Sequence, residues 1–508
     1  MQRERLWKLL LPVLYPFLFA IFPLLSMLSS NIGEARVREL LLPVAFILGL
    51  GMALWVALAP VFPDRHKRAL CLSLLWVPFY GYGRAVDAFR TWFDFDSMLS
   101  PPQLALAGIA VALNFGAPMY WLIKTRREFR TLSKVMNMIA LSCIAVSGLA
   151  LGNSLLQQSQ YEVNRVADDA ALGDPATYPD IYYLIFDAYA RADYLDEAFN
   201  HDNGPFLDAL RARGFYVADR SRSNYMYTQM SLASSLNLDY LDDTLVQTVT
   251  KDWDAAVAVL AKQIWDNGVV HFLQQRDYEF ITFASWVTAA EIIAADRFIK
   301  PDMPFMTNYQ QMIIDQTPIR SIMNRIKRRR KPFPVFFSLD EIESLERKTQ
   351  PMFVFAHVLA PHLPHTRNAQ GESVNDPPYE EGYRGEVAYL NARVTEIVDA
   401  VLARNPNSIF VIQGDHGPIS DWRMAGTVPA DFDESNWPRF VRDRTAILNA
   451  YYFPDQAYAN LLYPEITPVN SFRAIFNRTF GSSFELLEDV SYVYTQDATV
   501  YTRVAEVY

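Results

Sequence analysis

An acidic residue and a histidine stand side by side late in the chain, within Gly414-Asp415-His416-Gly417. A carboxylate beside an imidazole offers oxygen and nitrogen ligands suited to Zn²⁺ or Mn²⁺, and the flanking glycines let the backbone turn sharply. Residues 409–413 form a mostly apolar, β-rich run, which predicts a buried strand ending at this pair. A solvated turn rich in Asp and Gly is the alternative, and the preceding strand favours the metal-ligand interpretation.

Two further side chains are candidates for the same metal site. Asp187 ends the apolar run 181–186, where a buried carboxylate is costly unless it is paired or binds a cation; a helix N-cap is its other possible role. A hydroxyl such as Thr228 that opens a helix gains from the helix dipole, and a bound dication would make it a nucleophile. A plain N-cap is the alternative for Thr228, and Ser223 and Ser231 are rival hydroxyls.

Three of the seven histidines lie within nine residues, as His357, His362 and His365. The prolines between them stop a helix or a central strand, so an ordered loop would present imidazoles to a phosphate or a leaving group. We predict that His362 is catalytic and that His357, His365 and Asn224 contact the substrate. A structural histidine is the alternative for each imidazole.

The elements that must position these residues alternate between strands and helices, which predicts a mostly parallel sheet covered by helices. Ligands of such sheets bind beyond the carboxyl ends of the strands, where Asp187, the histidine segment and Asp415 all fall. We expect strands at 181–186, 215–217, 278–283, 352–357 and 408–413, and helices at 205–213, 270–276 and 386–403.

The first part of the chain is predicted to cross a membrane about five times, because a crossing needs about 20 apolar residues. The segment interrupted by Pro78 and Gly81-Tyr82-Gly83 is the weakest of the five. We place the spans near 9–30, 38–61, 69–86, 103–123 and 133–153. The division that follows is a helical membrane domain at 1–153, a linker at 154–179 and a catalytic domain at 180–508.

Positive charge sets the orientation of such a bundle. Basic residues cluster before the first span, at 65–68 and at 124–134, so these loops are expected in the cytoplasm and the carboxy-terminal half outside. Four helices and one re-entrant segment would instead place that half inside. The basic run Arg325–Lys331 is interpreted as a solvated loop, or alternatively as a contact with anionic headgroups or an anionic glycan.

Composition excludes several other classes of function. The net charge of −10 argues against a nucleic-acid partner, which would favour a basic face. The two cysteines, Cys71 and Cys143, both lie in apolar runs of the first part. The catalytic half therefore has no disulfide, zinc ribbon or cysteine nucleophile.

The order of these motifs resembles that of the alkaline-phosphatase/sulfatase superfamily: a first strand ending in Asp187, the Thr228 segment, Pro361-His362 and Gly-Asp-His-Gly. Nearly the whole chain resembles the membrane-bound branch that contains lipoteichoic acid synthase and the phosphoethanolamine transferases, and it looks closest to bacterial "sulfatase-like hydrolase/transferase" membrane proteins. The resemblance implies a multi-pass protein of the bacterial inner membrane with about five helices. It also implies an alkaline-phosphatase-like α/β catalytic domain on the periplasmic side.

The resemblance also implies the site roles. Asp187, Thr228, Asp415 and His416 would bind one divalent metal ion, Mn²⁺ or Zn²⁺, with Thr228 as nucleophile and His362 near the transferred phosphate. No histidine follows His416, which fits the single-metal arrangement of lipoteichoic acid synthases better than a two-metal site. A formylglycine motif is absent from the sequence, which argues against sulfate-ester hydrolysis.

We therefore predict transfer of a substituted phosphate, of phosphoglycerol or phosphoethanolamine type, through a phospho-threonine intermediate. The donor would be a membrane phospholipid, and the acceptor an extracytoplasmic glycan or lipid. A phosphodiesterase or phosphatase would use the same residues with water as acceptor. A non-catalytic membrane scaffold with a degenerate sulfatase-like fold is the alternative from a different class.

Overall fold

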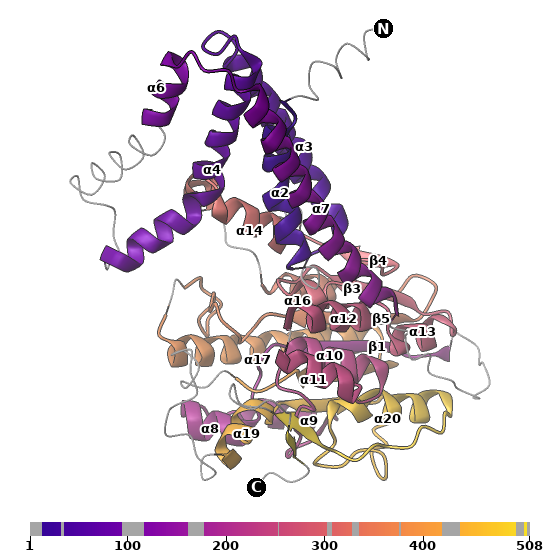
Figure 1. The fold of residues 1–508 in the computed structure, drawn as a ribbon. Coiled ribbons are helices and arrows are strands. Elements are labelled where there is room, and N and C mark those ends of the chain that lie inside the picture. Colours follow the sequence, from indigo (N-terminus) through magenta and orange to yellow (C-terminus); the bar gives the residue numbers. More distant parts are fainter. Residues whose placement is uncertain are drawn as a thin grey trace. The chain divides into compact units, whose positions relative to one another are not determined.

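The chain forms two compact units in the computed structural model (Figure 1). One comprises Met1–Gln160 with Met306–Lys331, and the other Tyr161–Phe305 with Pro332–Tyr508. The structure describes residues 13–31, 35–93, 116–160, 177–251, 253–301, 307–327, 335–374, 377–418, 437–493 and 502–504.

The first unit is helical. Among the residues that the structure describes, two helices are long and apolar enough to cross a membrane, Val37–Ala57 and Arg130–Leu156, and a shorter apolar helix covers Tyr15–Ser29. Most of the predicted span 103–123 lies outside the described residues, so the number of crossings stays a prediction. The elements are α2 (Tyr15–Ser29), η2 (Val37–Leu40), α3 (Leu41–Ala57), α4 (Arg65–Phe93), α6 (Ala117–Lys124) and α7 (Arg130–Gln160).

Two features of this unit suit a lipid environment. Large apolar side chains point outward, with Leu42 on α3 69% exposed and Leu149 on α7 74% exposed, an arrangement that water would disfavour. Polar atoms instead turn inward, where the Trp76 indole donates a hydrogen bond to a carbonyl of α2 at 2.8 Å. Pro78, which interrupts the apolar stretch of the weakest predicted span, does not break the helix, since α4 continues through it.

A segment from the second half of the sequence packs with these helices. It forms α14 (Asn308–Gln316) and α15 (Ile319–Lys327). The buried Tyr309 donates its hydroxyl to the carbonyl of Leu24 at 2.8 Å, and Arg320 pairs with Asp87 at 2.8 Å. The predicted division places this segment with 180–508, whereas its contacts group it with the helices of the first unit.

A seven-stranded sheet forms the centre of the second unit, in the order β2-β7-β6-β1-β5-β3-β4. β1, β3, β4, β5 and β6 pair in parallel, while β7 pairs antiparallel with both β6 and β2. The expectation of a mostly parallel sheet is confirmed. The strands are β1 (Asp180–Phe186), β2 (Tyr216–Val217), β3 (Glu279–Phe283), β4 (Arg297–Ile299), β5 (Met352–Val358), β6 (Ser408–Gly414) and β7 (Asn449–Tyr452).

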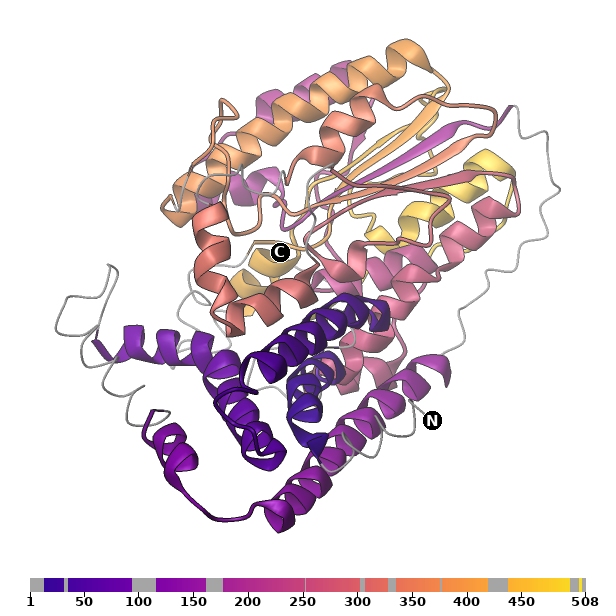
Figure 2. The ribbon, with the colours of Figure 1, turned by 90° about the horizontal axis from the view of Figure 1, so that it is seen from above.

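Helices cover both faces of this sheet (Figure 2). Side chains of β1 alternate between the two cores, Tyr183 entering one and Leu184 the other. Burial on both faces explains why these strands are continuous apolar runs. One face carries α10 (Thr228–Asn237), α12 (Trp253–Trp265), α13 (Gly268–Gln274) and α20 (Pro468–Phe480), and the other α8 (Ala192–Phe199), α9 (Gly204–Ala212), α16 (Phe337–Ser344) and α17 (Tyr379–Arg404).

The remaining elements of this unit lie between or after those strands and helices. These elements are α11 (Asp243–Lys251), η5 (Thr288–Ala290), α19 (Trp437–Thr445), β8 (Ser491–Val493) and β9 (Thr502–Val504). Only a few residues connect α19 to strand β7, and the end of α19 reaches the candidate site described below.

Candidate metal centre and active site

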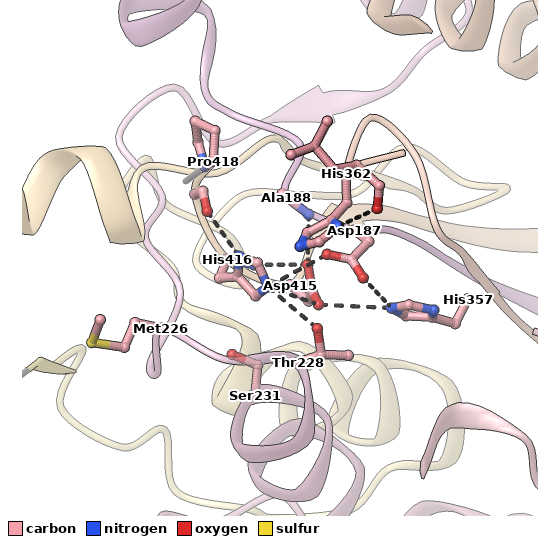
Figure 3. Close-up of polar contacts among 12 residues, drawn as sticks. Asp187, Ala188, Met226, Thr228, Ser231, His357, His362, Asp415, His416 and Pro418 are labelled. Carbon is pink, nitrogen blue, oxygen red and sulfur yellow. Dashed lines mark hydrogen bonds and ion pairs between the residues drawn. The ribbon is translucent and has the colours of Figure 1, made fainter. Parts of the chain in front are cut away.

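Three neighbouring parallel strands end at one edge of the sheet and bring the candidate side chains together (Figure 3). Asp187 directly follows β1, His357 lies near the end of β5, and Asp415 directly follows β6. The register pairs Ile185 with His357 and Phe186 with Gly414, so Asp187 and Asp415 lie at the same level and His357 lies two residues before it along the strands. The expectation that the carboxyl ends of the strands would converge is therefore met by the structure.

Thr228 is the first residue of α10 and meets this edge from a helix. Its Oγ1 lies 3.2 Å from Nε2 of His416, and the same nitrogen is 3.4 Å from Oδ1 of Asp187 and 3.7 Å from Oδ2 of Asp415. All four side chains are buried. Four residues far apart in the sequence thus place oxygen and nitrogen atoms around one point.

The imidazole of His416 is oriented by a backbone contact. Its Nδ1 lies 2.8 Å from the carbonyl oxygen of Gly417, and a carbonyl only accepts, so Nδ1 carries the proton of the neutral ring. The lone pair of Nε2 is then directed at the cluster, as metal-binding histidines require. Burial lowers the pKa of His416 to about 4, which keeps this ring neutral near pH 7.

His357 enters the cluster from the side opposite to His416 (Figure 3). Its Nε2 lies 3.6 Å from Oδ2 of Asp187 and 3.7 Å from Oδ2 of Asp415. These three residues could hold one metal ion, since one ligand atom from each lies within 4.8 Å of the others. The sequence predicts a substrate contact for His357, whereas the geometry makes it a candidate metal ligand.

The buried carboxylates of Asp187 and Asp415 lie close enough for a negative charge on one to disfavour ionisation of the other. Burial, and then the charge of Asp415, raises the pKa of Asp187 well above its ordinary value. Burial also opposes ionisation of Asp415, but His416, His357 and the N–H of Ala188 outweigh it and hold the pKa of Asp415 below its usual range. The pair therefore favours a single negative charge unless a cation is present.

Unsatisfied atoms indicate what the cluster can bind. Oδ1 of Asp187, Oδ2 of Asp415 and Nε2 of His357 are buried and have no hydrogen-bond partner within the described part of the chain. Buried polar atoms without partners are costly. A divalent cation that accepts oxygen and nitrogen ligands would satisfy all three, so these residues fit Zn²⁺ or Mn²⁺.

Local backbone geometry holds the carboxylates in place. Ala188 has a positive φ of 64°, which costs a non-glycine residue roughly 1 kcal/mol or more. This conformation directs its N–H to Oδ1 of Asp415 at 3.0 Å. A Cβ at Gly414 would lie 2.4 Å from the carbonyl oxygen of Tyr189, and one at Gly417 2.1 Å from that of Asp443. These glycines therefore allow the neighbouring backbone, rather than a ligand, to approach closely.

His362 lies beside the cluster (Figure 3). Its ring centroid is 6.4 Å from that of His416, and its Nδ1 is 2.7 Å from the carbonyl oxygen of Leu363. The ring is partly exposed, with Nε2 available to a bound molecule. A partly exposed imidazole beside the nucleophile could contact a phosphate or a leaving group.

Two of the predicted substrate contacts lie elsewhere. His365 is buried against α17, with Nδ1 3.3 Å from Oε2 of Glu386. Asn224 donates from Nδ2 to Oγ1 of Thr467 at 2.9 Å, and its Oδ1 accepts from the N–H of Val469. The structure does not bring either side chain to the cluster, because both are engaged in holding loops to neighbouring helices.

The geometry also distinguishes Thr228 from the two other candidate hydroxyls, Ser223 and Ser231. Ser231 lies one helical turn after Thr228, but its Oγ donates a hydrogen bond to the carbonyl of Tyr225 at 2.9 Å. Ser223 lies five residues before Thr228, where its backbone pairs with Thr445. Thr228 is the hydroxyl that the structure places in contact with the cluster.

Comparisons with known proteins gave similarities of structure. No family model matches the chain, and no curated protein matches it. The periplasmic domain of EptC from Escherichia coli, in complex with Zn, is similar with 12% sequence identity and a TM-score of 0.44 over 66% of this chain and 94% of that one. The integral membrane phosphoethanolamine transferase EptA from Neisseria meningitidis is similar with 11% identity and a TM-score of 0.36, over 90% and 95% of the two chains.

These structural neighbours are enzymes of the alkaline-phosphatase/sulfatase superfamily. They include the phosphoethanolamine transferase EptC from Campylobacter jejuni, with 12% identity and a TM-score of 0.38 over 64% of this chain and 95% of that one. The protein yidJ from Bacteroides fragilis, described as a putative sulfatase, is similar with 12% identity and a TM-score of 0.39 over 66% of this chain and 85% of that one. At these identities and TM-scores the likeness decides neither the activity nor the substrate of this chain.

Proposed function

We propose that the chain is a membrane-bound, metal-dependent phosphotransferase that moves a substituted phosphate from a phospholipid to an extracytoplasmic acceptor. The observation that carries this proposal is the contact of Thr228 with His416 at 3.2 Å beside the buried Asp187 and Asp415. A hydroxyl at a helix start, next to a metal-binding cluster, is the arrangement expected of an activated nucleophile.

Asp187, Asp415, His416 and Thr228 would hold one divalent ion, with His357 as a further candidate ligand. Such an ion lowers the pKa of a bound hydroxyl and neutralises charge on phosphoryl oxygens. The buried atoms without partners, described above, support this fit.

The residues of the chain would carry the reaction in two steps. The Thr228 hydroxyl loses its proton to solvent, and Oγ1 then forms a bond to phosphorus while the bond from phosphorus to the diacylglycerol oxygen breaks. His362, protonated on both nitrogens with its Nδ1–H directed at the carbonyl of Leu363, donates its Nε2 proton to that leaving oxygen and becomes neutral. In the second step the acceptor hydroxyl gives its proton to His362 and attacks phosphorus, and Thr228 leaves.

The location of the catalytic unit is proposed from the distribution of charge. The basic loops at 65–68 and 124–134 are expected in the cytoplasm. With an odd number of crossings, the catalytic half of the sequence would then lie on the periplasmic side, where phospholipid headgroups could supply the donor.

The decisive experiment detects the intermediate. The full chain is reconstituted in vesicles of phosphatidylethanolamine and phosphatidylglycerol with Mn²⁺ or Zn²⁺, and its intact mass is measured. We expect an adduct of about 100–200 Da on Thr228, the size of the possible headgroup phosphates under a two-step covalent scheme, and none in Thr228→Ala. Turnover without an adduct, or full activity of Thr228→Ala, would refute the proposal.

The same experiment separates the transferase from its alternatives. Release of a free headgroup phosphate without labelling of an added glycan or lipid acceptor would indicate a hydrolase that uses water. A wild-type chain that binds neither metal ion and forms no adduct would indicate a non-catalytic scaffold.

A further inference from the structure

We propose that Arg444 is a positioning residue of this centre, tying the loop that carries Asp415 and His416 to the segment that presents Thr228. The inference rests on the proposed function for its catalytic consequence, but its structural part is separate. An arginine near the end of a charged helix is ordinarily a surface residue, so the sequence alone does not single out Arg444.

The side chain of Arg444 is buried and reaches both segments. It lies in the last turn of α19 and is 1% exposed. Its Nη1 donates hydrogen bonds to the carbonyl oxygens of Gly417 at 3.1 Å and Pro418 at 2.9 Å, and its Nη2 donates to that of Met226 at 2.5 Å. One guanidinium thus bridges the residues just after His416 and those just before Thr228.

The backbone around Arg444 strengthens the same link. The N–H of Gly417 donates to the carbonyl of Arg444 at 2.8 Å, and the N–H of Ser223 donates to that of Thr445 at 2.7 Å. The end of α19 therefore lies between the two segments and bonds to each. Neither segment is joined to the other by a strand pairing of the sheet, so their spacing depends on contacts of this kind.

Arginine suits this position better than lysine does. The guanidinium is planar and holds several N–H donors in a fixed fork, so two nitrogens can serve carbonyls of two segments at once. A lysine ammonium carries the same charge on a single atom. Exchanging the two residues therefore removes the geometry of the bridge while keeping its charge.

The charge also suits the site. Asp187, Asp415 and an ionised Thr228 would carry three negative charges. One divalent ion together with the Arg444 guanidinium balances them. This balance of charge fits a centre that binds a single metal ion, with Arg444 supplying the remaining positive charge.

The test compares Arg444→Lys with Arg276→Lys in the full chain in detergent. Arg276 is a matched control, since it is 3% exposed and donates to the carbonyl of Phe272. We expect Arg444→Lys to bind Mn²⁺ about tenfold more weakly by titration, and kcat to fall about 100-fold with KM nearly unchanged, because small displacements of reacting groups cost that much. Arg276→Lys is expected to stay within about threefold of the wild type.

Wild-type Mn²⁺ affinity and kcat in Arg444→Lys would overturn the inference, and so would equal losses in both variants, which would indicate general destabilisation. If Arg444→Lys does not fold, Arg444→Gln is assayed at saturating Mn²⁺, where kcat within about threefold of the wild type overturns it. Weakened Mn²⁺ binding in Arg444→Lys, combined with an active Thr228→Ala, would support the bridge and refute the proposed function.

Discussion

Replacing Asp187 by asparagine should stabilise the metal-free protein while removing its response to metal. Asp187 and Asp415 contribute ligand atoms that lie within 4.8 Å of one another. At an effective dielectric constant of about 20, two charges at that distance or less repel by at least about 3 kcal/mol. Near pH 7 the wild type bears this cost as repulsion or as uptake of a proton by Asp187. Asparagine has nearly the same shape and is neutral without taking up a proton, so the variant avoids that cost.

The pH dependence of the stability provides a second, independent test of this prediction. Burial and the charge of Asp415 raise the pKa of Asp187, so in the metal-free state the folded protein binds this proton more tightly than the unfolded chain does. Its stability is then greatest below about pH 4 and decreases as the pH rises from there toward the raised pKa. Asp187→Asn should lack this part of the decrease, and its advantage over the wild type should grow with pH.

The assay is thermal unfolding of the full chain in detergent with a chelator and with excess Mn²⁺ or Zn²⁺. With chelator near pH 7, a gain of about 3 kcal/mol corresponds to a rise in Tm of roughly 3–6 °C for a unit of this size. A metal ion at 100 times its Kd should add about 2.7 kcal/mol to the wild type and far less to the variant. A lower Tm in chelator, or an undiminished metal response, would refute the reasoning.

Three other predictions follow from the described contacts. His362→Gln should lower kcat about 100-fold or more without weakening Mn²⁺ binding by titration, because its ring lies 6.4 Å from that of His416 and outside the ligand cluster; weaker binding would place it among the ligands. Burial raises the pKa of Asp443 to about 6, so Asp443→Asn should raise the free energy of unfolding by an amount that grows from about pH 4 to 6 and then levels off at about 3 kcal/mol, measured as a rise in Tm; a difference that does not change with pH would contradict this. Tyr309→Ala should expose 307–327 to limited trypsin digestion, because the buried ring and its bond to Leu24 are lost, whereas the control Ile322→Ala, at a site 59% exposed, should not.

The sequence was sufficient for the central strands and for one edge of the sheet. β1, β5 and β6 are buried on both faces, so they are continuous apolar runs that stand out from their surroundings. Asp187 and Asp415 follow such runs directly, and parallel strands necessarily bring their carboxyl ends to one edge. β7 was not predicted, because four residues at an antiparallel position give little periodicity to recognise.

Other features depended on contacts that no local pattern encodes. Thr228 and Ser231 share a helix and a residue class, and only the bond of Ser231 to Tyr225 separates their roles. The histidine cluster likewise gave no sign that His357 would join the carboxylates while His365 would turn to α17. Side-chain direction at the end of a strand is decided by the pairing register and by neighbouring helices, which the sequence of one segment does not contain.

The unfavourable features of the centre are themselves an argument for a cation. A positive φ at Ala188, two carboxylates that raise each other's cost of ionisation, and buried ligand atoms without partners all reduce stability. A fold used only as a scaffold could remove each of them by a single neutral substitution. The surrounding bonds from Ala188, Gly417 and Arg444 instead hold the unfavourable arrangement in place. Strain and charge maintained in this way are expected where binding of a cation, and the chemistry that follows it, offsets their cost.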